Sequence, residues 1–125
     1  MAQNQVVTPY RNLDLDETGV IVDATPCKVA VVSLCNLHAT AVRYVKFYNK
    51  ATAATNADTP ILTIPVAPSI LGGSIDVNLL HREWPFNTGL SMRCTTGIAD
   101  NDTGAPGNNE MVVNLGIIEN YNYTL

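Results

Sequence analysis

The sequence predicts an all-β fold, an antiparallel β-sandwich of the jelly-roll or immunoglobulin-like type with about seven to eight strands. From Val20 onward, apolar and β-branched residues form short runs, each bounded by Pro, Gly, Asn or Asp. Such runs are typical of strands joined by turns. No stretch carries a convincing apolar stripe at helical spacing. At 125 residues, the chain has the length of one domain.

Residues 1–18 differ from the rest because polar and acidic side chains dominate them. We interpret them as an N-terminal arm, and residues 19–125 as the single sandwich domain. The arm is either a frayed terminus or an extended segment that becomes ordered on a neighbouring subunit or lattice. Its apolar side chains, the expected anchors, include Tyr10, Leu13 and Leu15.

Seven strands are expected along the domain, with mostly short connections. The segment 28–36 is apolar on both faces, which predicts a central strand or a strand in a subunit interface. Prolines bracket the segment ILTI, and because proline cannot donate to a ladder, we expect an edge strand there. The expected strands are Val20–Asp23, Lys28–Asn36, Ala41–Asn49, Ile61–Val66, Ser74–Leu80, Leu90–Thr95 and Met111–Tyr121.

The strand 41–49 carries an aromatic ring and a cation on each face, because successive side chains of a strand alternate. This pattern suits a sheet that packs on a core on one side and is touched by something on the other. One face is Arg43, Val45 and Phe47; the other is Tyr44, Lys46 and Tyr48. Trp84, the only tryptophan, is interpreted as a core plug or as an interface anchor.

The composition is 46% hydrophobic and only 14% charged, with a net charge of -4. An acidic chain without a basic run gives no field for a polyanion, so we expect neither nucleic acid nor a membrane as partner. No secretory leader is recognisable at residues 1–12, and no apolar run approaches the roughly 20 residues that span a bilayer. We therefore expect synthesis in a cytoplasm.

Residues that carry chemistry are few. Cys27, Cys35 and Cys94 are expected to be reduced, because their number is odd and no metal-ligand spacing occurs. Neither histidine adjoins a nucleophile motif, so we expect no enzyme, no catalytic residues and no cofactor. The polar loop 95–110 matches only a fragment of a calcium-loop pattern. We interpret its Asp and Asn residues as turn caps, and its glycines as sites of positive φ.

Five segments together resemble a family of small structural proteins of tailed bacteriophages. They are RYVKFYNKAT (43–52), DTPILTIPV (58–66), FNTGLSM (86–92), TTGIADNDTGAP (95–106) and VVNL (112–115). The resemblance covers roughly residues 30–115, about two-thirds of the chain. It implies a β-sandwich module of the virion, either a capsid decoration (cement) protein or a component of head or tail fibres. The arm and the residues after 116 depart from the shorter family pattern.

The sequence and this resemblance together predict a decoration protein on the phage capsid surface. Its expected partners are the major capsid protein and further copies of itself, most simply as a homotrimer, because low charge and apolar strands favour self-association. The alternative is a fibre or tail module that binds a receptor or glycan. We expect Tyr10, Leu13 and Leu15 to dock on the shell, and Tyr44, Lys46 and Tyr48 to form the subunit interface, with Trp84 as a further anchor.

Overall fold

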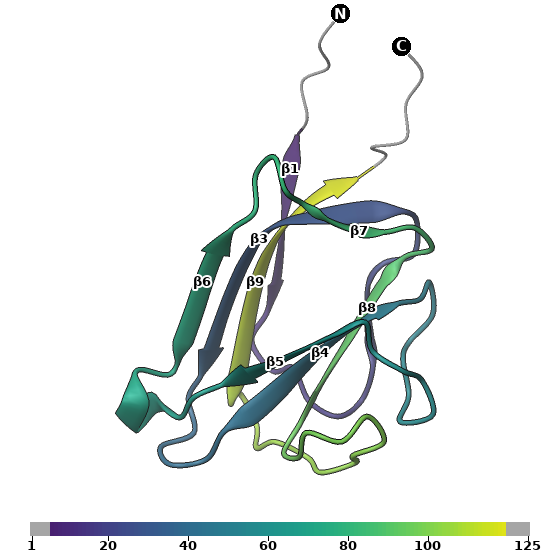
Figure 1. Cartoon of the computed structure of the whole chain (residues 1–125). Helices are drawn as coiled ribbons and strands as arrows, with labels where there is room; N and C mark the ends of the chain where they lie inside the picture. Colours follow the sequence, from purple (N-terminus) through teal and green to yellow (C-terminus); the bar gives the residue numbers. More distant parts are fainter. Residues whose placement is uncertain (1–5, 120–125) are drawn as a thin grey trace, which may run out of the picture.

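The computed structural model describes residues 6–119 as two antiparallel sheets packed face to face, which confirms the predicted β-sandwich (Figure 1). Sheet A has the order β1-β9-β3-β6, with β7 also pairing with β3; sheet B has the order β2-β8-β4-β5. The elements are β1 (Val7–Asn12), β2 (Val20–Asp23), β3 (Cys27–Asn36), β4 (Arg43–Asn49), β5 (Leu62–Val66), the 3-10 helix η1 (Ser69–Leu71), β6 (Ser74–Asn78), β7 (Trp84–Phe86), β8 (Leu90–Thr95) and β9 (Met111–Glu119).

The predicted strands match β2 to β6, β8 and β9 in order, and their bounds differ by no more than two residues. The segment between the prolines forms the first part of β5, which lies at an edge of sheet B as predicted. The predicted end of the last strand, Tyr121, lies outside the described residues. Two further strands, β1 and β7, bring the number in the described part of the chain to nine.

Strand β1 occupies residues 7–12 of the predicted arm. It pairs antiparallel with β9 from Val7 opposite Ile118 to Asn12 opposite Val113. Leu15, which follows β1, is 1% exposed and belongs to the core. The sequence did not indicate a strand here because β1 is an exposed edge strand, in which Tyr10 is the residue packed against the core. Residues 1–5 of the expected arm lie outside the described residues.

Strand β3 is central, as predicted, because it pairs with β9 on one side and with β6 and β7 on the other. A register shift between Val29 and Val31 interrupts its alternation. Such a bulge changes which face successive residues point to. Val29 and Val32 therefore both reach the core, where strict alternation had placed them on opposite faces.

The core lies between the two sheets and is built from aliphatic side chains around Phe47 and Phe86. Trp84 is half-buried, and its ring meets that of Phe47 edge-on at 6.1 Å between centroids. It therefore packs on the core. Cys27 and Cys94 are buried free thiols, and burial raises the pKa of each to about 12. At neutral pH both are protonated and behave as small apolar side chains.

The contrast between Leu15 and Leu13 gives a test of the N-terminal segment. Leu15→Ala should lower the free energy of unfolding by about 2–5 kcal/mol, because it leaves a cavity in the core. Leu13 is 44% exposed, so Leu13→Ala should change the free energy of unfolding by no more than about 0.5 kcal/mol. Urea unfolding of both variants measures the difference. Equal, small effects would mean that this segment is an arm outside the domain.

Candidate functional site

The outer face of sheet B, which the sequence assigned to a subunit interface, is covered by the chain itself. Lys46 and Tyr48 are 0% and 1% exposed, and Arg93, on the neighbouring strand β8, is 2% exposed. Three loops lie over them: residues 13–19, 50–60 and 96–104. The last of these runs along the lower end of the molecule in Figure 1, where the yellow-green loop enters β9.

Arg93 and Lys46 hold these loops in place through backbone oxygens. The guanidinium of Arg93 donates to Glu17 O at 2.8 Å, to Asp102 O at 2.8 Å and to the Tyr48 hydroxyl at 3.1 Å. Lys46 Nζ donates to Ala99 O at 2.5 Å. The two cations are directly opposite each other in the β4–β8 ladder. Burial, and then the charge of Arg93, lower the pKa of Lys46.

The loop 50–60 is held in place by a neutral side chain, that of Ser91. Ser91 Oγ accepts from Ala54 N at 2.8 Å and donates to Val20 O at 2.9 Å. Gly19 is needed at this contact, because a Cβ there would lie 2.0 Å from Ala54 O. Something does touch this face, as the sequence suggested, but it belongs to the same chain. The predicted interface at Lys46 and Tyr48 is therefore wrong as a free surface, and Tyr44 alone of the three retains partial exposure.

The expected shell-docking residues are also mostly internal. Leu15 lies in the core, and Tyr10 is half-buried against it. Leu13 is exposed, directly after β1. Trp84, the further anchor, packs on Phe47. The structure does not bring these residues together into one surface.

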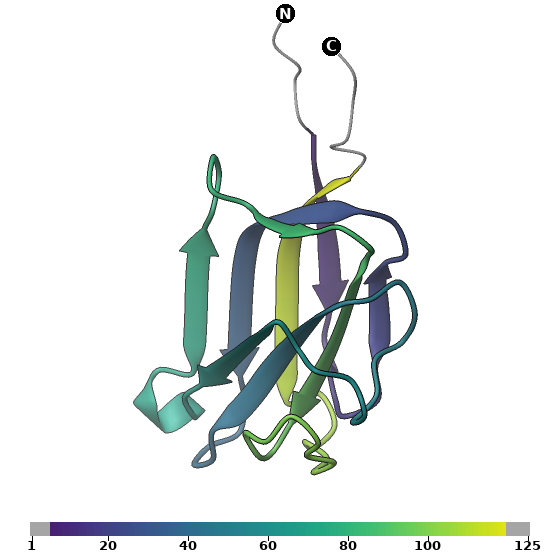
Figure 2. The same ribbon diagram turned by 45° about the vertical axis from the view of Figure 1, so that its right-hand side comes forward.

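A different apolar surface lies at the end of the sandwich opposite the start of β1. Leu37, Ile70 and Leu71 are 53%, 73% and 74% exposed, and we call them the end patch. Backbone bonds hold their loops together: Ser69 N donates to His38 O at 2.8 Å, and Ile70 N donates to Ala39 O at 3.2 Å. Figures 1 and 2 both place η1 at this end. Exposed aliphatic side chains on loops that are joined in this way make a candidate interaction surface.

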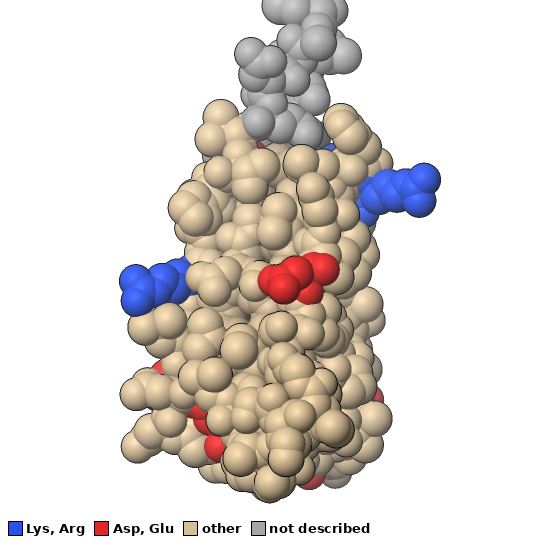
Figure 3. Space-filling model, turned by 90° about the vertical axis from the view of Figure 1, so that its left-hand side faces the viewer, with Lys and Arg blue, Asp and Glu red and all other residues tan. Residues whose placement is uncertain are grey.

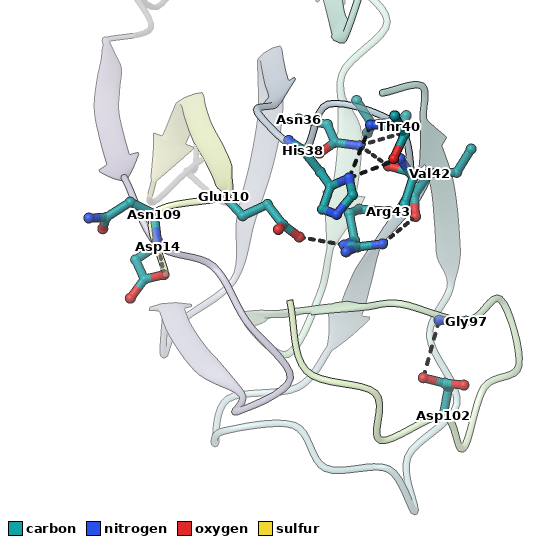
Figure 4. Close-up of polar contacts among 12 residues, drawn as sticks. Asp14, Asn36, His38, Thr40, Val42, Arg43, Gly97, Asp102, Asn109 and Glu110 are labelled. Carbon is teal, nitrogen blue, oxygen red and sulfur yellow. Dashed lines mark hydrogen bonds and ion pairs between the residues drawn. The ribbon is translucent and has the colours of Figure 1, made fainter. Parts of the chain in front are cut away.

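The loop that carries Leu37 is ordered by buried polar groups (Figure 4). The side chain of Asn36, 0% exposed, donates to Ala41 O at 2.9 Å and to Val66 O at 3.1 Å, and accepts from His38 N at 2.9 Å. Nδ1 of His38 accepts from the backbone of Thr40 and Ala41. The ring is thus a structural acceptor, and in its neutral form it carries its proton on Nε2.

An ion pair lies beside this loop. Arg43 Nε pairs with the Glu110 carboxylate, and each side chain is only 11% exposed. Arg43 Nη1 also donates to Val42 O at 3.0 Å. The pair joins β4 to the residue that precedes β9 (Figure 4). The loop that carries Leu37 of the end patch is therefore already ordered in the free chain. This lowers the entropy cost of binding a partner there.

The polar loop 95–110 acts as a set of turns, as interpreted from the sequence. Asp102 Oδ1 accepts from Gly97 N at 3.2 Å and from Gly104 N at 2.8 Å. The expected positive φ at these glycines is wrong: a Cβ at either position would instead collide with side chains, those of Asp102 and Thr96. Among residues 6–119, no group of three or more His, Cys, Asp or Glu side chains is placed to hold a metal ion.

The end patch was missed because Ile70 and Leu71 lie between Pro68 and the Gly72-Gly73 turn. The sequence did offer one signal for an exposed apolar surface, namely two large aliphatic residues within a turn. Both glycines have positive φ, and a Cβ at Gly73 would lie 2.8 Å from Asn36 O. Glycine is therefore needed for η1 to lie against the Leu37 loop.

No helix in the described part of the chain is long and apolar enough to cross a bilayer. No protein-family model, curated protein or solved structure matches the chain.

Asn36 gives a direct test of the base of the end patch. Asn36→Ala should lower the free energy of unfolding by at least about 2 kcal/mol. It leaves buried backbone groups without a hydrogen-bond partner, and each such group costs roughly 1–3 kcal/mol. Asn114→Ala is the matched control, since Asn114 is exposed on β9; it should cost no more than about 0.5 kcal/mol. Amide exchange at residues 37–42 should accelerate only in Asn36→Ala. Equal behaviour of the two variants would remove Asn36 from this role.

Proposed function

We propose that this chain is a capsid decoration (cement) protein, which binds the major capsid protein lattice of a tailed phage and stabilises the head. The resemblance of segments between residues 43 and 115 to small virion proteins supports this role. The all-β sandwich, a module suited to a rigid shell, agrees with it. On this proposal the chain is located on the capsid surface.

The end patch is the observation that carries the proposal. Leu37, Ile70 and Leu71 expose more than half of their surface from ordered loops. The patch replaces Tyr10, Leu13 and Leu15 as the docking surface, because those residues do not form one. Its aliphatic character suits an apolar depression between capsid subunits.

The energetics favour a particle over a single partner. Burying the exposed parts of three aliphatic side chains contributes roughly 3–6 kcal/mol, whereas association costs about 4–15 kcal/mol. One copy would therefore bind weakly to one isolated capsid subunit. On a lattice, connected copies engage several sites at once, and effective concentration converts weak contacts into stable attachment.

The fibre or tail alternative calls for exposed aromatic rings, Trp84 and Tyr121, clustered with the Asp100 loop. Tyr121 lies outside the described residues. Every aromatic side chain among residues 6–119 is buried or half-buried. Strand β7, which begins at Trp84, and the loop 96–104 lie toward opposite ends of the sandwich (Figure 1). Trp84 is half-buried against Phe47 and the end patch is aliphatic, and both observations support decoration of the shell over receptor or glycan binding.

The docking variant combines Ile70→Ser with Leu71→Ser. It should remain folded, because both side chains are largely exposed, and it should bind purified capsids that lack the chain at least roughly tenfold more weakly. The matched control is Ile61→Ser with Leu80→Ser, which changes two exposed aliphatic residues outside the patch. Co-sedimentation with capsids measures both.

Three outcomes would contradict the proposal. The first is equal capsid binding by the docking variant and its control. The second is absence of the chain from purified particles. The third is a copy number of only tens per particle with location on the tail, which would support the fibre alternative.

A further inference from the structure

The outer edge of β6 carries backbone groups that no strand satisfies. Sheet A ends at β6, and Figure 2 shows it at the margin of the sheet. Asn36 N donates to Gly73 O at 2.7 Å, and Leu79 N donates to Ala30 O at 2.6 Å. These bonds show which residues face β3, because the hydrogen-bonded residues of an antiparallel strand alternate.

The backbone groups of Ser74, Asp76 and Asn78 therefore point away from β3. In the part of the chain that the structure describes, no strand pairs with them. They form a row of N–H and C=O groups to which an extended strand can add.

The other edge strands carry devices that discourage such addition. Strand β7, which pairs only with β3, has three residues and contains Pro85. Strand β1 has Pro9 within it, and β5 has Pro65. Strand β2 has four residues and a register irregularity between Ile21 and Asp23. Strand β6 has no proline, no Lys or Arg, and an unbroken register with β3. It is the one sheet edge among residues 6–119 that is open to regular pairing.

Apolar side chains are incompletely covered at the same place. Ile75 and Val77 of β6 face the core but are only half-buried, and so is Ile64 of β5. Figure 3 views this side of the molecule, where Lys and Arg side chains lie only at the margins. A strand added to β6 would therefore do two things at once: it would cover this apolar surface, and it would pair with the outward N–H and C=O groups of β6.

We propose that β6 is a self-association edge, on which β6 of a second copy adds as an antiparallel strand related by a two-fold axis. The sequence SIDVN alternates polar and apolar residues and has the same pattern in both directions. Antiparallel pairing with itself therefore places apolar side chains beside apolar ones on the core face. A two-fold interface requires this self-complementarity.

Charge selects the register. Asp76, which accepts from Ser33 Oγ at 2.6 Å, is the only charged residue of β6. Pairing centred on Asp76 would place two carboxylates directly opposite each other, which is unfavourable. A shift of two residues places Asp76 opposite Ser74 or Asn78 of the second copy, and both of these carry hydrogen-bond donors.

The edge predicts a dimer and not the trimer expected from the sequence. A closed ring built by extending the sheet needs β6 to pair with a different edge of the next copy. The other edge strands, β1, β2, β5 and β7, discourage that pairing. The inference does not depend on the proposed function, but a dimer would present two end patches to a shell.

Matched charge variants test the pairing through sedimentation equilibrium. Ser74→Glu with Asn78→Glu places carboxylates opposite Asp76 of the second copy, whereas Ser74→Lys with Asn78→Lys places ammonium groups there. Each contact occurs twice by symmetry. The Glu pair should therefore weaken the dimer by roughly 2- to 30-fold, and the Lys pair should strengthen it by a similar factor.

A proline variant tests the backbone contribution. Asp76→Pro removes an outward N–H that β3 does not use, so the strand should stay paired within its own sheet. It should be monomeric at concentrations where Asp76→Ala, which loses the same carboxylate but keeps the N–H, remains dimeric. Thermal unfolding of both variants verifies that each is folded.

Three results would overturn the proposal: a wild-type chain that is monomeric up to millimolar concentration, a trimer, or equal effects of the Glu and Lys pairs. Each can be obtained with the isolated chain, so failure here is distinguishable from failure of capsid binding.

Discussion

The guanidinium of Arg93 is the interaction on which the surface of this protein depends. It lies on the outer face of sheet B and joins three elements that are distant in sequence: the β1–β2 loop, strand β4 and the β8–β9 loop. A buried cation without partners would cost several kcal/mol. Carbonyl oxygens and a hydroxyl satisfy it, and this requirement draws the loops over the sheet. Lys46, opposite it in the ladder, does the same through Ala99 O.

This closure determines which surfaces remain for partners. Sheet B has one face on the core and the other beneath the chain's own loops. The linker 50–60, small and polar in sequence, is a cover that Ser91 holds in place. Among the surfaces that stay open are an end of the sandwich with exposed aliphatic side chains and an edge strand with unused backbone groups. We propose both as surfaces for adhesion. They adjoin each other, because η1, which carries Ile70 and Leu71, directly precedes β6.

The strands were predictable because their apolar runs are strong and bounded by Pro, Gly and Asn. Strand β1 was not, because an exposed edge strand with Pro9 requires few apolar residues. The bulge in β3 has no local signature, since it depends on how β9 pairs with it. Burial of Lys46 and Arg93 was likewise hidden: alternation places them on an outer face, and only the tertiary path of the loops shows that this face is covered. The end patch takes Leu37 and Ile70 from two separate loops, and only the folded structure shows that backbone bonds join these loops.

Hydrogen exchange of the chain, free and bound to capsids, tests the central claim most directly, namely that the closed face of sheet B leaves the end patch and the β6 edge as the adhesive surfaces. Amides of the loop 96–104 should be protected in the free chain, because Arg93 and Lys46 hold it, and capsid binding should leave their exchange unchanged. Binding should instead slow exchange at residues 37–42 and 69–73. Unprotected amides in 96–104 of the free chain, or new protection on capsids confined to that loop, would contradict the account.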